Sequence, residues 1–468
     1  MMIKYILLIL LALNIFFSLR VILFFRKTPS AGWAWSFILL FIPFCGIFMY
    51  FLFGLESYKY KDFIQKAKQD KELLKSMEKF LPATDAPLEG LKALNLFTSN
   101  APICSSNAVT FYHSGADKFE ELINDITNAK KFIHIQYYIL KNDKLGRRIM
   151  FALAAKAKEG VEVKVFVDKL GSRLANKKFF APLLEAGGDI VIFASSSIIQ
   201  FNFRNHRKIC IVDGAVGYIG GFNIGNEYLG IVRRFGQWRD CHMRLVGDGV
   251  KALEARFIMD YNYSTRSNKI NVSEFYFPKA VAKPVNPVDL QIISSGPDTE
   301  HHGILYAYIK MFGIAKKNIY IQTPYFVPDN SLLEVLTTAC LSGVDVKIMI
   351  PAKPDHPFVY WAALSYLGDL IKIGAKCYKF EGGFVHSKLV MIDGEIASVG
   401  TANMDIRSLK LNFEINAFLY NAKEVKFLED KFMVDVSNST IIDYDWYENR
   451  PNSTKIKESL CRLISPLL

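Results

Sequence analysis

Two short stretches of this chain carry histidine, lysine and aspartate at the same fixed spacing. The pattern H-x-K-x4-D-x6-G-x-x-N begins at His206 and again, 180 residues later, at His386. Imidazole can act as a nucleophile or move a proton near neutral pH, and an ammonium group stabilises anionic charge. Packing does not call for His and Lys at the edge of a strand, so the duplicated pattern predicts a site that performs chemistry.

The candidate site residues come from both copies of the pattern. The expected catalytic residues are the His, Lys and Asp of each copy, namely His206, Lys208, Asp213, His386, Lys388 and Asp393. The expected substrate-binding residues are the Asn that closes each copy and one acidic residue beyond it, namely Asn223, Asn403, Glu227 and Glu414. The two Glu residues could support a motif Lys or His from beside it, or could equally form structural ion pairs.

A metal centre is disfavoured by the residue types. A protonated Lys is not a metal ligand, and no third ligand recurs at fixed spacing beside the two His residues. The seven Cys residues contain no CxxC pair. We therefore expect neither a metal nor another cofactor.

The apolar residues that follow each H-x-K predict a strand that positions these side chains. Residues two apart in a strand project from one face, so His206 and Lys208 should point the same way, as should His386 and Lys388. The Asp-Gly pairs at 213–214 and 393–394 predict hairpin turns, because Gly accepts positive φ.

The repeat extends well beyond the motif. Residues 129–138 resemble 315–324, and residues 160–167 resemble 343–350. A period this long indicates two duplicated domains, which we place at 91–285 and 286–468. Each half alternates helix and strand and so predicts a mixed α/β sheet with helices on both faces. The expected helices are 116–128, 147–158, 303–314 and 332–341, and the expected strands are 132–138, 161–167, 319–323 and 344–350.

The amino-terminal 55 residues read as a membrane segment. They contain no Asp or Glu, and they form two apolar runs at 5–25 and 31–55, separated by a turn at 26–30. Each run is about the ~20 residues that a helix needs to cross a bilayer. The first is too long for a cleaved signal, and a second span follows it at once. We therefore expect a two-helix transmembrane hairpin.

The basic residues set the expected orientation and the expected partner. The Lys residues that flank the outer ends of the two runs outnumber the two basic residues of the turn, Arg26 and Lys27. Because positive charge near a span favours the cytoplasmic side, we expect both termini and the catalytic part to lie in the cytoplasm. A charged stretch at 56–90 should be a solvated helical linker. The net charge of +12 suits an anionic partner, and beside two spans it favours an anionic lipid surface over nucleic acid.

The doubled motif resembles that of the phospholipase D superfamily, over essentially all of 91–468. The resemblance implies that the halves fold together with one shared active site. One imidazole would attack a phosphodiester and give a phosphohistidine, while the other would protonate the leaving alcohol and then deprotonate the incoming one. Either His could take either role. The Lys residues would clamp the non-bridging oxygens with the Asn residues beside them.

Further strings make the chain similar to the bacterial cardiolipin synthases. They are IPFCG (42–46), GNEY (225–228), WRD (238–240), SSGPD (294–298), TPYFVPD (323–329), DH (355–356) with Tyr360 and Tyr366, MDIRS (404–408), NFE (412–414) and RLISP (462–466). Asn226 departs from the acidic residue expected before Glu227. Tyr325, Tyr366 and His356 could pack or contact lipid.

This resemblance implies a plasma-membrane phosphatidyltransferase that joins two phosphatidylglycerol molecules into cardiolipin and releases glycerol. The alternatives are a hydrolase of the same superfamily, a transphosphatidylase that uses a phosphatidylethanolamine donor, and an inactive membrane scaffold. All six His, Lys and Asp positions are present, which disfavours a scaffold. Four arginines near the first motif could bind a second phosphate or form a solvated basic loop: Arg204, Arg207, Arg233 and Arg234.

Overall fold

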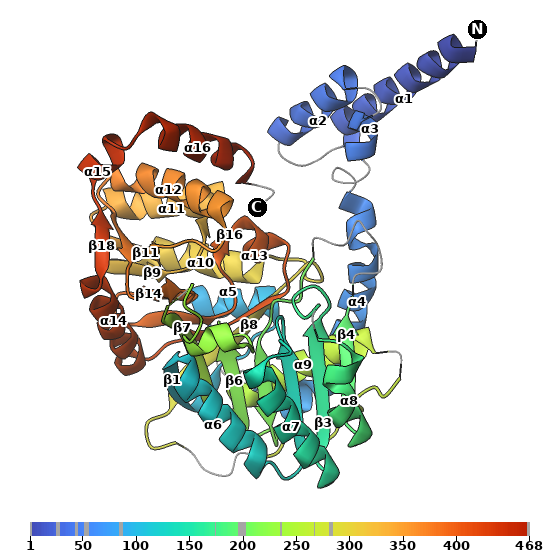
Figure 1. Ribbon diagram of the computed structural model, residues 1–468, viewed down its shortest axis with the longest axis vertical. Coiled ribbons are helices and arrows are strands. Elements are labelled where there is room, and N and C mark those ends of the chain that lie inside the picture. The colour runs from blue at the N-terminus through green and yellow to red at the C-terminus, as the bar shows by residue number, and fades with distance from the viewer. Residues whose placement is uncertain are drawn as a thin grey trace. The chain divides into compact units, whose positions relative to one another are not determined.

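The computed structural model describes residues 2–24, 29–42, 45–50, 56–83, 88–173, 175–194, 203–234, 236–265, 267–279 and 284–465 (Figure 1). The chain divides into an amino-terminal unit, which ends at residue 66, and a body that begins at residue 67.

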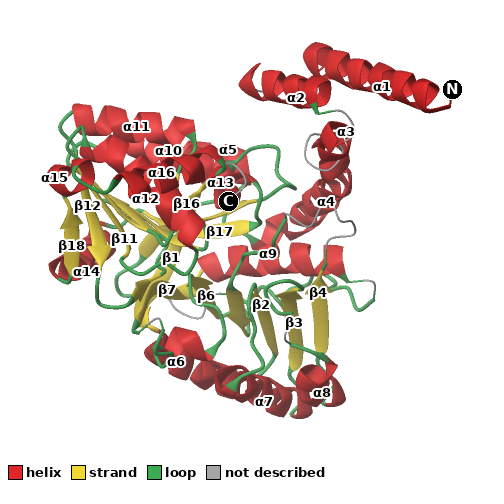
Figure 2. Cartoon of the chain, turned by 45° about the horizontal axis from the view of Figure 1, so that its top comes forward, coloured by secondary structure: helices red, strands yellow, loops and turns green. Residues whose placement is uncertain are grey.

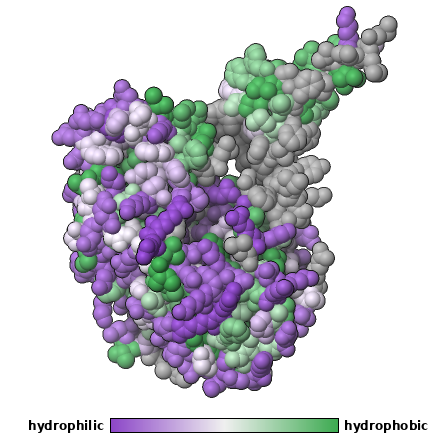
Figure 3. Space-filling model, in the orientation of Figure 1, coloured by the Kyte–Doolittle hydropathy of each residue, from purple (hydrophilic) through white to green (hydrophobic). Residues whose placement is uncertain are grey.

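The amino-terminal unit is helical and apolar. It contains α1 (Met2–Phe24), α2 (Pro29–Phe41), α3 (Cys45–Met49) and the start of α4 (Glu56–Met77). Buried Val21 on α1 packs with Leu39 of α2 and with Tyr50. Hydrophobic side chains gather over these helices, whereas the visible face of the body is mostly hydrophilic (Figure 3).

One helix in the described part of the chain is long and apolar enough to cross a membrane, over Lys4–Leu23. The second predicted span, 31–55, falls on the 13 residues of α2 and on α3, with residues 43–44 and 51–55 outside the described ranges. The structure thus supports one of the two predicted spans.

The body is built on one mixed sheet that runs through both halves of the chain. Its strand order is β18-β12-β11-β9-β14-β15-β17-β8-β1-β7-β6-β5-β2-β3-β4, with β13 paired to β7 outside this path. The strands of the first half are β1 (Cys104–Ser114), β2 (Phe132–Tyr137), β3 (Glu162–Asp168), β4 (Asp189–Phe193), β5 (Ile209–Val212), β6 (Val216–Gly220) and β7 (Trp238–Gly247). Those of the second half are β8 (Val288–Ser295), β9 (Asn318–Gln322), β11 (Asp345–Pro351), β12 (Lys376–Phe380), β13 (Phe384–Val385), β14 (Leu389–Ile392), β15 (Ile396–Gly400), β17 (Glu414–Leu419) and β18 (Ser439–Ile442).

The order of strands repeats about the centre of this sheet. Reading outward, β1-β7-β6-β5-β2-β3-β4 corresponds to β8-β17-β15-β14-β9-β11-β12, and β1 pairs antiparallel with β8. A separate pair, β10 (Phe326–Val327) and β16 (Met404–Asp405), is parallel. The internal repeat seen in the sequence is therefore a repeat of the fold.

Helices cover both faces of the sheet, as the alternating pattern predicted. In the first half α6, α7 and α8 line one face and α9 the other, and in the second half α10–α12 lie opposite α14 (Figure 2). Their bounds are α5 (Gly90–Ser99), α6 (Gly115–Asn128), α7 (Lys144–Lys158), α8 (Lys177–Glu185), α9 (Gly249–Ser264), α10 (Gly303–Ile314), α11 (Asn330–Leu341), α12 (Pro357–Ile371), α13 (Ile406–Lys410), α14 (Ala422–Ser437), α15 (Tyr444–Glu448) and α16 (Asn452–Leu463).

The strands predicted to follow each H-x-K are β5 and β14, which begin directly after the motif lysines, while the segments with the motif His pair with the other half of the chain. One local prediction needs correction. The stretch at 56–90 is not simply a solvated linker. The later turns of α4 pack on the body, where Met77 is buried and Asp70 forms an ion pair with Arg256 of α9.

Candidate active site

Each His of the duplicated motif is held by backbone of the opposite half. Asn205 bridges to Phe413, and the His206 N–H donates to the Phe413 carbonyl at 2.9 Å. In the second copy β13 runs parallel to β7, and the His386 N–H donates to the Arg239 carbonyl at 2.7 Å. The two motifs therefore reach one site only because the halves are folded against each other.

A buried carboxylate from the opposite half orients each imidazole. His206 Nδ1 lies 3.0 Å from both carboxylate oxygens of Glu414, and His386 Nδ1 lies 2.7 Å from Asp240 Oδ2. Glu414 and Asp240 are fully buried. A carboxylate at Nδ1 favours the tautomer that carries its proton there, which leaves Nε2 as the reactive nitrogen.

Each motif lysine contacts its own motif histidine, and neither lysine is among the described residues that line the cavity. Lys208 Nζ donates to the His206 carbonyl at 2.8 Å, and Lys388 Nζ donates to the His386 carbonyl. Both ammonium groups are buried. Their burial lowers the pKa of Lys208 to about 7 and that of Lys388 to about 8. A bound anion would restore their charge, so this is an environment that favours a phosphate.

Before an anion binds, burial favours the neutral form of both imidazoles. Burial and the neighbouring Lys388 lower the pKa of His386 to about 4, against the opposing effect of Asp240. Burial lowers the pKa of His206 as well, and Glu414 opposes that shift. A neutral imidazole is the form that can act as a nucleophile or accept a proton.

Both imidazoles open into one cavity of about 570 Å³. Residues of both halves line it, among them Asn223 and Asn403 at the ends of the two motifs. The Asn223 carboxamide accepts from the Ile139 N–H and donates to the Tyr228 hydroxyl, both at 3.1 Å. The structure thus brings together four of the predicted polar side chains at the cavity wall: His206, His386, Asn223 and Asn403.

The two motif aspartates bind backbone N–H groups. Asp213 accepts three backbone N–H groups at the start of β2, from Lys130, Lys131 and Phe132. Asp393 accepts the equivalent N–H groups of 316–318. Neither is among the described residues that line the cavity. These contacts give both carboxylates a structural role at the turns of the hairpins, and their catalytic role stays a prediction.

The two acidic residues predicted to bind substrate have different contacts in the structure. Glu414 reaches His206, as described above, and also accepts from the Thr401 hydroxyl at 2.5 Å. Glu227 forms an ion pair with Lys141 at 2.5 Å and is not among the described cavity residues. Glu227 is therefore corrected from a substrate-binding residue to a structural ion pair.

Asp240 is the functional residue that motif spacing missed. The sequence shows it only as part of the string WRD, since its distance along the chain from His206 differs from that between His386 and Glu414. A second signal was available in the repeat, because β7 and β17 occupy equivalent places in the sheet and each carries a buried acid.

Three further side chains resolve as follows. Tyr325 and His356 line the cavity, and the Tyr325 hydroxyl donates to Asp355 at 2.6 Å. Tyr366 instead contacts the Ser465 hydroxyl at 2.9 Å in a buried position.

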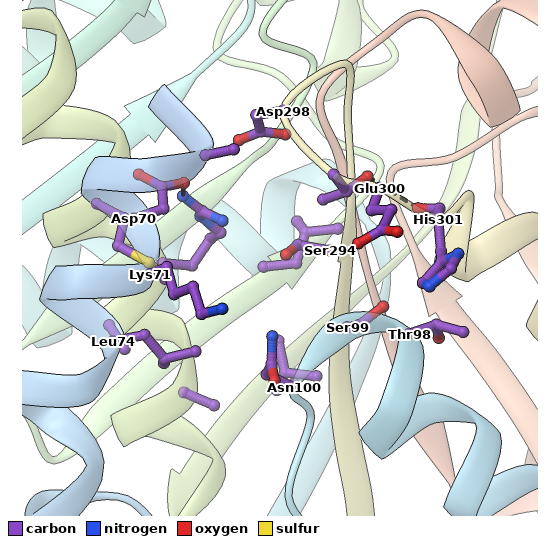
Figure 4. A pocket seen from close by; sticks show the side chains of 18 of the residues that line it. Asp70, Lys71, Leu74, Thr98, Ser99, Asn100, Ser294, Asp298, Glu300 and His301 are labelled. Atoms are coloured by element: carbon purple, nitrogen blue, oxygen red, sulfur yellow. Dashed lines mark hydrogen bonds and ion pairs between the residues drawn. The ribbon is translucent and has the colours of Figure 1, made fainter. Parts of the chain in front are cut away.

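A second cavity, of about 420 Å³, lies where α4 meets the body. Figure 4 shows Asp70 and Lys71 on α4 facing Ser294, Asp298 and Glu300 across it. Neither motif His nor motif Lys is among its described lining residues. We therefore assign the chemistry to the cavity with the two imidazoles.

Comparison with known proteins defines the class. Residues 122–233 and 308–436, one stretch in each half, match the family model described as "Cardiolipin synthase, PLD-like domain", and residues 12–54 match "Phospholipase_D-nuclease N-terminal". The crystal structure of phosphatidylserine synthase from Haemophilus influenzae Rd KW20 shares the fold, with a TM-score of 0.62 over 81% of this chain and 100% of that chain, at 15% identity. The protein therefore has two phospholipase D-like domains.

Full-length relatives narrow the class to a family. The chain is 46% identical to the major cardiolipin synthase ClsA of Bacillus subtilis (strain 168), over 97% of each protein. It is 44% identical to the cardiolipin synthase of Listeria monocytogenes serotype 4a (strain HCC23), over 100% of each. The chain belongs to the cardiolipin synthase family.

Proposed function

We propose that this protein transfers a phosphatidyl group from one phosphatidylglycerol to another and so makes cardiolipin and glycerol. The observation that carries the proposal is the pair of buried imidazoles, each oriented by a carboxylate of the opposite half, in one cavity. The cardiolipin synthases that resemble the chain over nearly its whole length support the same reaction.

The reaction proceeds in two displacements. In the first, Nε2 of one neutral His forms a bond to phosphorus and the P–O bond to glycerol breaks. The other His, protonated because the bound anionic phosphodiester and its carboxylate partner favour the imidazolium, gives its Nε2 proton to the glycerol oxygen and becomes neutral. In the second, that imidazole takes a proton from the hydroxyl of a second phosphatidylglycerol, whose oxygen attacks phosphorus and releases the first His. Water in place of the lipid alcohol would give phosphatidic acid, so exclusion of water favours synthesis.

The neighbouring groups stabilise the charge that develops on phosphorus oxygens. Lys208 and Lys388, which contact His206 and His386, supply positive charge, and Asn223 and Asn403 supply polar groups at the cavity wall. Glu414 and Asp240 hold the imidazoles in place and stabilise whichever becomes an imidazolium. The positive charge that this mechanism needs comes from the protein's own side chains.

The amino-terminal unit anchors the enzyme where its substrates are. We place both apolar segments, 5–25 and 31–55, in the plasma membrane as a hairpin, with the catalytic domains at 91–285 and 286–468 on the cytoplasmic side. The length of α1 and the match of 12–54 to an amino-terminal family model support this arrangement. Two lipid substrates then stay at high local concentration.

The test is product analysis with purified full-length protein in micelles of labelled phosphatidylglycerol. We expect glycerol and cardiolipin to appear together, and we expect His206→Ala and His386→Ala each to abolish both. Phosphatidic acid as the main product would contradict the synthase, and full activity in either variant would contradict the two-histidine mechanism.

A further inference from the structure

Two arginines share the cavity with the catalytic imidazoles. Arg204 stands two residues before His206, and Arg407 lies on α13. The Arg204 carbonyl accepts the Phe413 N–H, and the Arg407 carbonyl accepts the Asn412 N–H, both at 2.9 Å. Both arginines thus flank the short segment that leads to Glu414, the partner of His206.

The other basic residues near the first motif are placed differently. Arg207 is fully buried and donates to Asp260 at 2.6 Å and to the Glu414 carbonyl at 3.1 Å. It therefore links the two halves of the chain by hydrogen bonds. Arg233 is exposed in the loop before β7 and is not among the described cavity residues. Of Arg204, Arg207 and Arg233, Arg204 is the one found among the described residues that line the cavity.

The two guanidinium groups lie close enough to repel each other. Burial and the charge of Arg204 lower the pKa of Arg407. Tyr138, whose ring lies 5.0 Å from that of His206, hydrogen-bonds to Arg204, and burial raises its pKa against the opposing charges of both arginines. The nearby acids Asp168 and Asp405 accept backbone N–H groups, from 170, 171 and 205 and from 408, and each also interacts electrostatically with one arginine, Asp168 with Arg204 and Asp405 with Arg407. Such a pair favours an anion placed between its members.

The repeat shows that this basic pair exists once. The positions 180 residues from Arg204 and Arg407 are occupied by Phe384 and Glu227. The His and Lys residues, by contrast, occur in both halves. The site therefore has one centre built from duplicated residues and one basic pair outside the duplication. The cardiolipin product carries two phosphates, so a second group that binds phosphate would have a ligand.

We propose that Arg204 and Arg407 form a second phosphate site, which binds the phosphate of the acceptor phosphatidylglycerol while the first phosphorus is held at the two motifs. This rests on the proposed function. It gives the enzyme a means to prefer an acceptor that carries a phosphate over water or free glycerol.

The experiment compares two acceptors on the same phosphohistidine, with the full chain in mixed micelles. Phosphatidylglycerol as acceptor gives cardiolipin, and labelled free glycerol gives labelled phosphatidylglycerol by reversal of the first displacement. Loss of a charge-assisted hydrogen bond to the acceptor phosphate should lower the ratio of cardiolipin formation to glycerol exchange by about tenfold or more in Arg204→Gln and in Arg407→Gln.

The controls distinguish failure of the second phosphate site from failure of the proposed cardiolipin synthesis. Arg233→Gln removes an exposed positive charge near the same motif and should keep the wild-type ratio. Arg204→Lys and Arg407→Lys keep the charge and should retain part of the preference; if a Gln variant fails to fold, its Lys variant decides by a raised KM for the acceptor lipid. A wild-type ratio in both Arg204→Gln and Arg407→Gln overturns the second phosphate site. A wild-type enzyme that makes no cardiolipin overturns the proposed function instead.

Discussion

At the scale of single residues, the chemistry depends on pairing each imidazole with an acid that lies far away in sequence. Glu414 holds His206 and Asp240 holds His386; the side chains of the two acids are 0% exposed and those of the two histidines 11% exposed. In such surroundings a carboxylate both fixes the ring and stabilises its cationic form.

Removing either carboxylate charge should therefore slow the reaction. We expect Glu414→Gln and Asp240→Asn to lower kcat by about 10²–10⁴, because the paired imidazole loses its orientation and its stabilised imidazolium. The acidic limb of the pH profile should also move, which a purely structural defect would not cause. Glu227→Gln, whose acid pairs with Lys141 away from the cavity, is the matched control. Unchanged kcat and pH profile in both cavity variants would show that the acids do not position the imidazoles.

The motif lysines predict an alkaline loss of activity. Each Lys is charged below its pKa, and burial lowers these pKa values to about 7 for Lys208 and about 8 for Lys388. We expect kcat/KM, which reports the free enzyme, to fall as the pH rises through 7–8. The fall in kcat should come at higher pH, because a bound phosphate stabilises the ammonium groups. A flat kcat/KM from pH 6 to 9 would contradict this role.

Motif spacing predicts the two imidazoles, their lysines and the aspartates as one set, and the structure brings the two imidazoles to one cavity while each aspartate binds backbone at a turn. A repeat of H-x-K is visible in the chain because its residues are close in sequence, whereas the partner acids are brought in by strands of the other half. The aspartates share the spacing for another reason, since each closes a hairpin turn. Spacing alone does not separate a group that reacts from one that shapes the backbone.

At the scale of elements, the β5–β6 and β14–β15 hairpins end in turns that the Asp-Gly pairs make possible. Asp213 and Gly214 have φ of 55° and 66°, and Asp393 and Gly394 have φ of 55° and 69°. Positive φ at both central residues is typical of a type I′ turn, so this prediction is confirmed. The carboxylate then reaches back to the N–H groups that start β2 or β9.

The turn aspartates should matter for stability more than for chemistry. We expect Asp213→Ala to lower the free energy of unfolding by about 1–3 kcal/mol, because three N–H groups lose their acceptor. Thermal unfolding in micelles measures this, and the kcat of the folded fraction should stay near that of the wild type. Asp213→Asn, which keeps one acceptor oxygen, should be milder. A large loss of kcat with normal unfolding would return Asp213 to the catalytic set.

Most elements near the site could be predicted from the sequence, and the pairing between halves could not. The helix expected at 303–314 and the strand expected at 161–167 fall on α10 and β3 within one residue, since local hydrophobic pattern determines them. The parallel pairing of β13 with β7 joins residues about 146 positions apart, and no local pattern encodes it.

At the scale of the whole molecule, duplication explains how one chain builds a two-histidine site. The halves share a continuous sheet, joined by β1 and β8, and each half supplies one imidazole and the acid that holds the other. Separation of the halves would remove both pairs at once. The apolar helix α1 lies at the amino terminus, outside this arrangement, and suits a role in anchoring.

We expect a lipid phosphate to pass through one of these two imidazoles on its way to cardiolipin. Rapid quenching of the enzyme with phosphatidylglycerol labelled at phosphorus, followed by peptide mapping, tests it most directly. We predict an acid-labile adduct on His206 or His386 that passes into cardiolipin when unlabelled phosphatidylglycerol is added. A labelled adduct on any other residue, or cardiolipin formed at full rate with no adduct, would contradict the account.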